Sequence, residues 1–315
     1  MLSSDGIDHV RLRGLAKPFL TPRAVAQYGP AVNRSVEDAL NRFARAGGGD
    51  LVSGLVLPVA TATVARLLGQ PVEQAQRLVA LSLRLSDAAH PDEPGMRAAA
   101  VAMNKRLTAL LAWARRDPGD NLTTALLIAH RDGAVSTAEL LGSLSFILFA
   151  AVDSTLATVT TAAMHLLSSE YREARRALAL GTKDAPFIVD DVIRLAAPFT
   201  YGAWRFASEP LQLGGYVVDA GQLVVLAFPV ANVDPSRWPR AWHVMADRPG
   251  TARHVSFGYG PHFCPGAGLG HLQVRHVLHN LFHRFPRIRL AADVSALAWQ
   301  GSIARRAAAL PVLIG

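Results

Sequence analysis

The only cysteine of the chain, Cys264, lies in the segment with the strongest chemical pattern, residues 257–266. Glycines in this segment relax the steric limits on the backbone, so that it can turn tightly and approach a flat ligand. Pro265 follows the cysteine, and residues 267–285 have helical periodicity. Because proline is favoured at the first position of a helix, Cys264 is expected at or near the N-cap. The helix dipole and the free backbone N–H groups stabilise a thiolate there, and a thiolate is a metal ligand or a nucleophile.

Three roles are open to this cysteine, two chemical and one structural. As a nucleophile it needs a base, and His254 and His262 are close to it in the sequence. As an axial haem ligand it needs a glycine-rich loop and an apolar wall, which Phe257 and Phe263 supply. The third is a buried free cysteine in an ordinary turn. The spacing of the whole segment carries more information than the sequence Cys-Pro-Gly alone.

The composition excludes several classes of protein. Hydrophobic residues make up 50% of the 315 residues and charged residues 18%, which provides a sizeable core and excludes a disordered chain. One cysteine excludes an intrachain disulfide and a multi-cysteine zinc site, and fits a reducing compartment. The net charge of +8 comes mostly from scattered arginines, which argues against nucleic-acid binding. The N-terminus lacks the pattern of a signal peptide or an anchor, so we expect a cytoplasmic protein without membrane contact.

The elements that position these residues are mainly helices. Apolar spacing interrupted at Gly or Pro predicts helical segments at about 8–20, 23–46, 55–68, 72–88, 96–116, 121–130, 136–165 and 169–179. From about 199 to 230, β-branched runs separated by glycines predict short strands and hairpins. Because no linker-like tract marks a boundary, we expect one domain, 1–315, that is mainly α with small β-sheets, an α+β fold.

The segment 137–165 is the most apolar long helix. Such a helix belongs in the middle of a large domain or in a bilayer, and the polar break at Asp153, Ser154 and Thr155 favours the first. An ionisable side chain in that setting is costly unless it is paired or solvated. Asp153 is therefore a candidate for function. The alternative is that it and the neighbouring hydroxyls bond each other or a backbone carbonyl.

At the cysteine segment the sequence resembles the cytochrome P450 family, the haem-thiolate monooxygenases. The family pattern Phe-x-x-Gly-x-His/Arg-x-Cys-x-Gly is matched by Phe257, Gly260, His262, Cys264 and Gly266. The resemblance implies a cytochrome P450 fold, haem b as the cofactor, and Cys264 as the proximal iron ligand. Its thiolate then pushes electron density onto the iron and favours O–O cleavage.

The resemblance also places cations around the haem propionates. It implies this role for His9 and Arg13 on one helix, for Arg205, and for His262 two residues before the cysteine. Each of these residues alone would more often be a solvated basic side chain. Their occurrence together at the family positions is what supports the assignment.

A structural ion pair beneath the haem is a further implication of the resemblance. Asp191 and Arg194 stand where the family has Glu-x-x-Arg, and His243 stands where the family has an Arg as the third partner. Asp191 is shorter than the family's Glu, which alters its reach to that partner.

On the central helix, Asp153, Ser154 and Thr155 stand where the family has Asp/Glu-Thr-Thr, which implies a proton relay to bound dioxygen. Ala151 replaces the usual Gly next to the oxygen groove, with expected effects that range from slower oxygen activation to none. By family position the substrate-facing residues are Phe146, Ala150, Pro198, Phe199, Thr200 and Ile303.

The resemblance covers nearly all of the chain, which begins near the family's C helix at residues 4–13. An N-terminally truncated P450 fold is therefore expected, because family members usually have several helices and two strands before this point. Those parts close the distal pocket and pair with strands near 200–206 and 223–228. Three explanations for the missing N-terminal part are open. An upstream start was missed, the shorter chain is active with an open pocket, or the chain is a degenerate relative with a non-catalytic task.

The function implied is oxidation of a small apolar metabolite with dioxygen and with electrons from a ferredoxin or flavodoxin. His271, Arg275, His279 and His283 recur every four residues and offer a basic docking surface for the donor, or else an ordinary solvated face. The alternative function is a catalytically degenerate auxiliary protein that stabilises a partner enzyme. A haem protein that uses peroxide is a third alternative, which the retained relay residues oppose.

Overall fold

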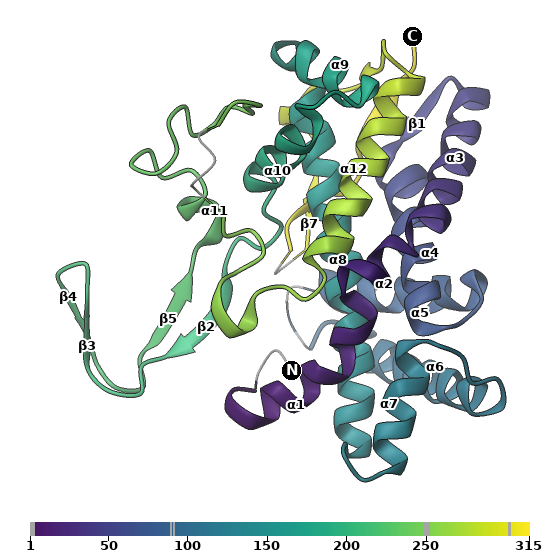
Figure 1. Ribbon diagram of the computed structural model, residues 1–315, viewed down its shortest axis with the longest axis vertical. Helices are drawn as coiled ribbons and strands as arrows, with labels where there is room; N and C mark the ends of the chain where they lie inside the picture. Colours follow the sequence, from purple (N-terminus) through teal and green to yellow (C-terminus); the bar gives the residue numbers. More distant parts are fainter. Residues whose placement is uncertain (1–3, 89, 91, 249–252, 302–303) are drawn as a thin grey trace.

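The computed structural model describes residues 4–88, 90, 92–248, 253–301 and 304–315. The chain is mainly helical with small sheets, as predicted, and the helices form one body in Figure 1. The helices are α1 (Gly6–Ala16), α2 (Pro22–Ala26), α3 (Gly29–Ala46), α4 (Leu57–Leu68), α5 (Val72–Asp87), α6 (Met96–Arg116), α7 (Leu122–Arg131), α8 (Thr137–Leu167), α9 (Arg172–Leu180), α10 (Ala185–Leu195), α11 (Phe228–Ala231) and α12 (Ala267–Arg284). The strands are β1 (Gly48–Asp50), β2 (Gly202–Phe206), β3 (Leu211–Leu213), β4 (Tyr216–Val218), β5 (Leu223–Leu226), β6 (Arg289–Leu290), β7 (Trp299–Gln300), β8 (Arg306–Ala307) and β9 (Pro311–Leu313).

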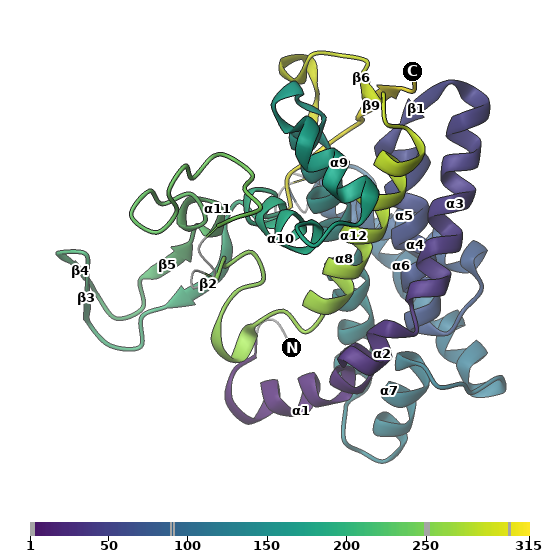
Figure 2. The same cartoon turned by 45° about the horizontal axis from the view of Figure 1, so that its top comes forward.

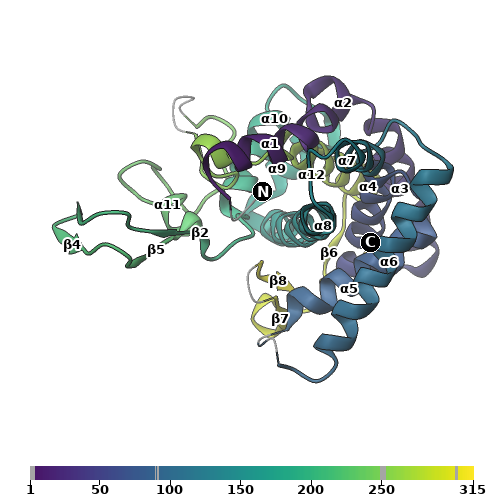
Figure 3. The ribbon, with the colours of Figure 1, turned by 90° about the horizontal axis from the view of Figure 1, so that it is seen from below.

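α8 is the central helix and is seen nearly end-on in Figure 3. It packs against α4, α5 and α12, and Leu144, Leu148 and Val152 on it are completely buried. Its first turn is fixed by a capping box, in which the side chains of Ser136 and Glu139 each accept the backbone N–H of the other. By length and composition α8 could cross a membrane, but 56% of its apolar window is buried inside the fold. Such burial is typical of the core helix of a soluble protein.

The described strands pair only antiparallel, in the orders β1-β9-β6, β2-β5, β3-β4 and β7-β8. Figures 1 and 2 both show β2, β5 and the β3-β4 hairpin extending away from the helices. Large apolar side chains on this extension are more than half exposed, at 64% for Trp204, 68% for Phe206 and 51% for Leu223. The small β7-β8 ladder packs against α8 through β8.

Prolines divide the N-terminal helices more finely than the periodicity predicts. The segment 23–46 is divided between α2 and α3, because Gly29 and Pro30 begin a new helix. Pro22 likewise begins α2, with the Thr21 hydroxyl accepting the Ala24 N–H at 3.3 Å. α10 lies outside the segments that the periodicity predicts. The elements that surround the cysteine are α1, α2, α10, α12 and the loop before α12.

Candidate functional site

The loop before α12 is held by its own backbone hydrogen bonds. The Cys264 N–H donates to the Phe257 carbonyl at 2.7 Å, and the Phe263 N–H donates to the Gly260 carbonyl at 3.0 Å. Gly258 and Gly260 have φ angles of +73° and +69°, in the left-handed region where other residues are strained. These two glycines therefore allow the loop to fold back onto Phe257.

The sulfur of Cys264 lies near the start of α12, but the cysteine is not the N-cap. The helix begins at Ala267 and its N-cap is Gly266, two residues later than the position of Pro265 suggests. Burial raises the pKa of the Cys264 thiol, while the Gly266 N–H and the charge of Arg13 oppose that shift. In the ligand-free chain, burial therefore opposes the thiolate that the sequence predicts, while the Gly266 N–H at the helix start favours it. A cation bound at the sulfur would reverse this balance.

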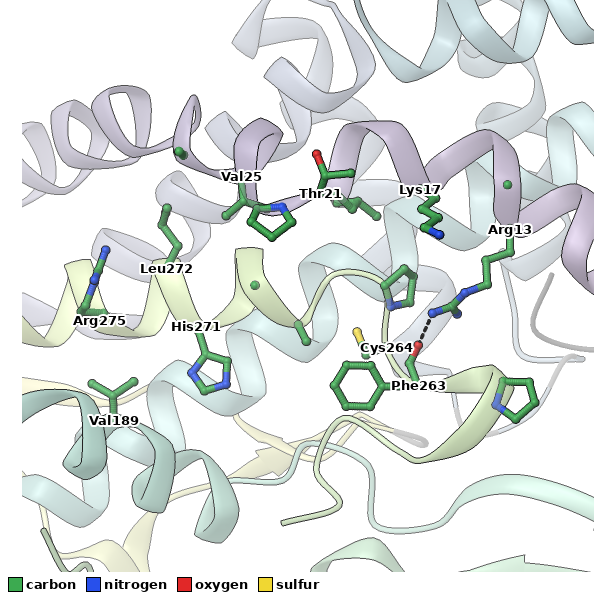
Figure 4. A pocket seen from close by; sticks show the side chains of 18 of the residues that line it. Arg13, Lys17, Thr21, Val25, Val189, Phe263, Cys264, His271, Leu272 and Arg275 are labelled. Carbon is green, nitrogen blue, oxygen red and sulfur yellow. Dashed lines mark hydrogen bonds between the residues drawn. The ribbon is translucent and has the colours of Figure 1, made fainter. Parts of the chain in front are cut away.

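A cavity of about 1050 Å³ lies beside Cys264, between the α1–α2 segment and α12 (Figure 4). Its described lining comes mainly from α1, α2, α10, α12 and the cysteine loop, and includes His9, Arg13, Phe263 and Cys264. Among these lining residues there is no acidic side chain and no residue of α8. The α8 residues predicted for oxygen chemistry therefore do not share this cavity.

Three of the predicted rim residues meet between α1 and the cysteine loop. The imidazole rings of His9 and His262 are 4.1 Å apart between centroids. Arg13 donates to the Phe263 carbonyl at 2.5 Å, as the dashed line in Figure 4 shows. His9 is buried, and this burial lowers its pKa. The neutral form of His9 is thus favoured in the ligand-free chain.

A carboxylate, Asp5, stands among the rim residues. It contacts Nε2 of His262 at 2.6 Å, and that hydrogen bond lowers the pKa of Asp5, with smaller contributions from the charges of Arg205 and His9. Arg205, the fourth rim residue, lies on β2 and donates to the Trp204 carbonyl at 3.1 Å. Asp5 therefore occupies a place that suits the anionic group of a ligand.

The pair formed by Asp191 and Arg194 is deeply buried. Arg194 donates to Asp191 at 2.7 Å and to the backbone carbonyls of Asn232 and Ala241 at 2.7 and 2.6 Å. Arg248 donates to the same carboxylate at 2.6 Å. Asp191 thus lies between two guanidinium groups, which offset the cost of its burial.

The structure differs from the sequence expectation at His243, because Arg248 occupies the place of the third partner. The His243 imidazole contacts Glu170 at 2.6 Å on the surface. Only the His243 carbonyl joins the network, accepting from Arg194 at 3.1 Å and from Arg248 at 2.7 Å. The family pattern has an Arg as the third partner, and Arg248, five residues after His243, is the arginine in this segment from which that partner could have been predicted.

Asp153 of α8 is 1% exposed and lies in a polar network that joins three elements. Its carboxylate accepts from Nη1 of Arg306 at 2.6 Å and from the Ser86 hydroxyl, and Arg306 also donates to Asp87 at 2.8 Å. Burial raises the pKa of Asp153, while the Ser86 hydrogen bond and the Arg306 charge act in the opposite direction. Sequence reasoning missed both partners, since neither Ser86 nor Arg306 belongs to a recognisable pattern.

The hydroxyls beside Asp153 bond to their own helix. Ser154 and Thr155 donate to the carbonyls of Ala150 and Ala151, one turn back in α8. Thr155 also accepts from the Gln273 amide of α12 at 3.4 Å. Both hydroxyls thus have the backbone partners that the sequence alternative described.

The described substrate-facing candidates lie on two segments: Phe146 and Ala150 on α8, and Pro198, Phe199 and Thr200 after α10. Ile303 lies outside the described residues. Phe199 forms a β-bridge with Ala304, and the Arg305 N–H donates to the Pro198 carbonyl at 3.2 Å. β8 begins one residue after Arg305 and packs against α8. Residues 304–307 therefore contact both α8 and the segment after α10.

The row of basic residues on α12 is divided between two environments. The imidazoles of His279 and His283 contact carbonyls at the end of α9 at 2.8 and 3.1 Å. Their rings are stacked at 5.7 Å. His271 and Arg275 instead line the cavity. The row therefore does not form one continuous basic surface.

The residues present fit a haem group. Cys264 offers a sulfur ligand with the Gly266 N–H directed at it, and the half-exposed Phe263 provides an apolar surface beside it. The rim residues gather basic groups at one edge, where Asp5 stands as a carboxylate. A thiolate ligand, an apolar wall and a rim for carboxylates are the requirements of an iron porphyrin with two propionates.

The comparisons with known proteins point the same way. A family model described as Cytochrome P450 matches residues 187–290. Cytochrome P450 107B1 of Saccharopolyspora erythraea is 32% identical over 309 residues, covering 97% of this chain and 75% of that protein. Nocardicin C N-oxygenase of Nocardia uniformis subsp. tsuyamanensis is 33% identical over 319 residues, covering 99% and 78%.

Solved structures agree with the sequence matches. The P450 enzyme CxnD, for C–S bond formation in chuangxinmycin biosynthesis, has a TM-score of 0.90 at 29% identity, covering 99% of this chain and 77% of its own. The alternative of a degenerate auxiliary protein has no support among these relatives.

Proposed function

Because the chain belongs to the cytochrome P450 family, whose monooxygenases use haem b, we propose that Cys264 is the iron ligand of this monooxygenase. The observation that carries the proposal is the Cys264 sulfur in contact with the Gly266 N–H, beside a cavity whose described lining is free of acidic side chains. Because burial raises the pKa of the free thiol, the thiolate forms together with iron binding. Bound haem supplies the activation of dioxygen and the transfer of one oxygen atom to substrate.

The rim residues hold the haem propionates. His262 exchanges Asp5 for one propionate, Arg205 turns to it from the Trp204 carbonyl, and Arg13 turns from the Phe263 carbonyl to the second propionate. His9, stacked on His262, keeps that ring in place. Arg13 and Arg205 thereby replace neutral carbonyl acceptors with carboxylates, and charge-assisted hydrogen bonds are shorter and stronger than neutral ones.

The buried pair of α10 positions the cysteine loop. Arg194 donates to the Asn232 carbonyl, and the Asn232 amide donates back to the Arg194 carbonyl at 3.0 Å. The same amide donates to Ser256 at 2.8 Å, and its oxygen accepts the Val255 N–H at 2.8 Å. This chain of contacts runs from Asp191 through Arg194 to the residue before Phe257. Asp191, Arg194 and the carbonyl of His243 therefore have a structural role.

Asp153, Ser154 and Thr155 form the proton relay. Asp153 would hold a proton on its carboxylate, and the two hydroxyls would pass it into the haem site after turning from the Ala150 and Ala151 carbonyls to which they now donate. The relay requires Asp153 to exchange Arg306 for water or a hydroxyl, since its carboxylate now bonds Arg306 and Ser86. Arg306 is thus placed to control when Asp153 takes up a proton.

The substrate in this proposal is a small apolar metabolite of secondary metabolism; one relative is named for the oxidation of nocardicin C and another acts in chuangxinmycin biosynthesis. Phe146, Ala150, Phe199 and Thr200, which are partly buried, and the buried Pro198 are the described residues proposed to face it. Their segments are joined through β8, which supports a shared pocket.

The electron donor is an acidic ferredoxin or flavodoxin that docks in the cytoplasm at the mouth of the cavity. Arg13, Lys17 and Arg275 line this cavity, and no acidic residue occurs in its described lining. Association steered by these charges weakens as salt increases. Residues 1–315 act as one haem domain in this account.

Product analysis under ¹⁸O₂ tests the function. The haem-loaded chain is incubated with a ferredoxin, its reductase and a panel of apolar metabolites, and products are examined by mass spectrometry. One ¹⁸O atom per oxidised product is expected, and the Cys264→Ser variant in the same mixture should give none. Product without ¹⁸O, or equal product from the variant, would contradict the proposal.

A further inference from the structure

Three side chains close to the Phe257 ring bring metal-binding atoms together. Asp190 lies on α10, His254 precedes the cysteine loop, and His271 lies on α12. One ligand atom from each lies within 4.8 Å of the other two. Nε2 of His254 is 3.3 Å from the Asp190 carboxylate, and Nε2 of His271 is 3.7 Å from the same oxygen.

These separations are close to those of a tetrahedral metal site. With metal–ligand bonds near 2.0–2.1 Å, two ligands of a tetrahedral zinc ion lie about 3.3–3.5 Å apart. Two of the three separations therefore need little change, and the imidazoles, whose ligand atoms lie within 4.8 Å of each other, must approach by up to about 1.5 Å. Three protein ligands leave a further position for water.

The Phe257 ring packs beside both histidines of this group. The Phe257 ring lies 5.7 Å from the His254 ring and 5.1 Å from the His271 ring between centroids. His254 is only 6% exposed, and Asp190 and His271 are partly open to solvent, which leaves an entry path. The hydrogen bond from His254 lowers the pKa of Asp190, and burial lowers the pKa of His271.

Two features oppose metal binding. The Ser256 N–H donates to Nδ1 of His254 at 3.2 Å, so the neutral ring carries its hydrogen on Nε2. A metal at Nε2 requires the other tautomer, and that backbone contact must lengthen. Arg275 also lies close enough for its charge to lower the pKa of His271. Both effects reduce affinity without removing a ligand.

We propose that Asp190, His254 and His271 form a binding site for a divalent transition cation of the zinc class. A cation there ties α10 and α12 to the segment before Phe257, whose carbonyl receives the Cys264 N–H. Carboxylate and imidazole ligands suit zinc, cobalt and nickel. The site uses none of the residues assigned to the haem rim or to iron ligation, so its test is independent of oxidation chemistry.

Titration with Zn²⁺ and Co²⁺ tests the site directly. The chain is studied in the Cys264→Ala background, which removes the competing thiol, and the haem-loaded protein is titrated in parallel. One equivalent of Zn²⁺ by calorimetry and the visible absorption of four-coordinate Co²⁺ are expected in both. Zn²⁺ should also raise the unfolding midpoint, since it binds the folded state.

Variants separate this site from other histidines. His271→Ala and His254→Ala should weaken Zn²⁺ binding at least about tenfold, and Asp190→Asn should do so while keeping the side-chain shape. His279→Ala/His283→Ala is the matched control, because it removes the other histidine pair of α12 and should leave binding unchanged. Circular dichroism checks that each variant folds. No Zn²⁺ uptake by the parent chain, or loss of uptake only in the control, would overturn the proposal.

Discussion

The guanidinium of Arg306 lies 2.6 Å from the carboxylate of Asp153, and the two side chains are 2% and 1% exposed. This pair joins β8 to the middle of α8 and extends to Asp87 at the end of α5. A buried carboxylate is costly without such a partner. The acid assigned to the proton relay is therefore also a structural element of the resting chain.

Removing Arg306 tests this double role. Arg306→Met leaves Asp153 buried without its cation, and we expect a loss of about 3–5 kcal/mol in the free energy of unfolding. Asp153→Leu with Arg306→Met should lose less than the sum of the two single changes, with a coupling of about 0.5–3 kcal/mol in urea unfolding. Additive losses would show that the contact contributes nothing specific.

Asp153→Asn tests the relay itself. It should lower the amount of product formed per electron consumed, and an unchanged ratio of product to electrons would remove Asp153 from the relay.

Removing the side chain of Arg248 should destabilise the fold more than removing that of His243. Arg248→Ala removes a charged hydrogen bond from buried Asp191, and we expect it to cost about 1.5–3 kcal/mol in the free energy of unfolding. His243→Ala removes an exposed contact with Glu170 and should cost less than about 1 kcal/mol. Urea unfolding of the two variants decides between them. A larger loss at His243 would restore the partner predicted from the family pattern.

The link between α1 and α8 predicts a dependence on pH. Hydrogen bonds from Arg11 and Ser136 lower the pKa of Glu139 from 4.5 to about 2. Because the folded pKa is depressed, the ionised carboxylate stabilises the fold above pH 4.5, and this stabilisation is lost as pH falls toward 2. The stability difference between the parent chain and Glu139→Gln should therefore shrink over that range in urea unfolding. A constant difference would mean that ionisation of Glu139 is not involved.

Two glycines of the cysteine loop make a matched pair. Gly260 has a φ of +69° with open space around it, so Gly260→Ala should cost about 1–2 kcal/mol through backbone strain alone. Gly266 has an ordinary φ, and a Cβ there would meet the Cys264 sulfur at 3.8 Å, a normal contact. Gly266→Ala should therefore destabilise the ligand-free chain less. Thermal unfolding compares them, and equal losses would contradict the strain argument.

Local patterns predicted the parts of the site that are continuous in the sequence. The glycine spacing and Cys264 define the loop, and apolar periodicity located α8 and α12. Pairings across the chain were not predictable in this way. Arg306 meets Asp153 across 153 positions, and Arg248 replaces the side chain of His243, because packing rather than spacing selects the partner.

The environment of a predicted helix face was also beyond the sequence. His279 and His283 have the spacing of an exposed row, yet the rings of both contact carbonyls near the end of α9, and His279 is partly buried. Likewise, the position of Cys264 next to a helix start suggested a stabilised thiolate. Burial outweighs the single N–H of Gly266, and only the folded chain shows how much burial there is.

The central claim is that Cys264 ligates haem iron as a thiolate. The most direct test is the carbon monoxide difference spectrum of the haem-loaded, dithionite-reduced protein, recorded for the parent chain and for Cys264→Ser. We expect a strongly red-shifted Soret band for the parent chain and its loss in the variant. A parent chain that binds haem without that band, or a variant that keeps it, would contradict the assignment.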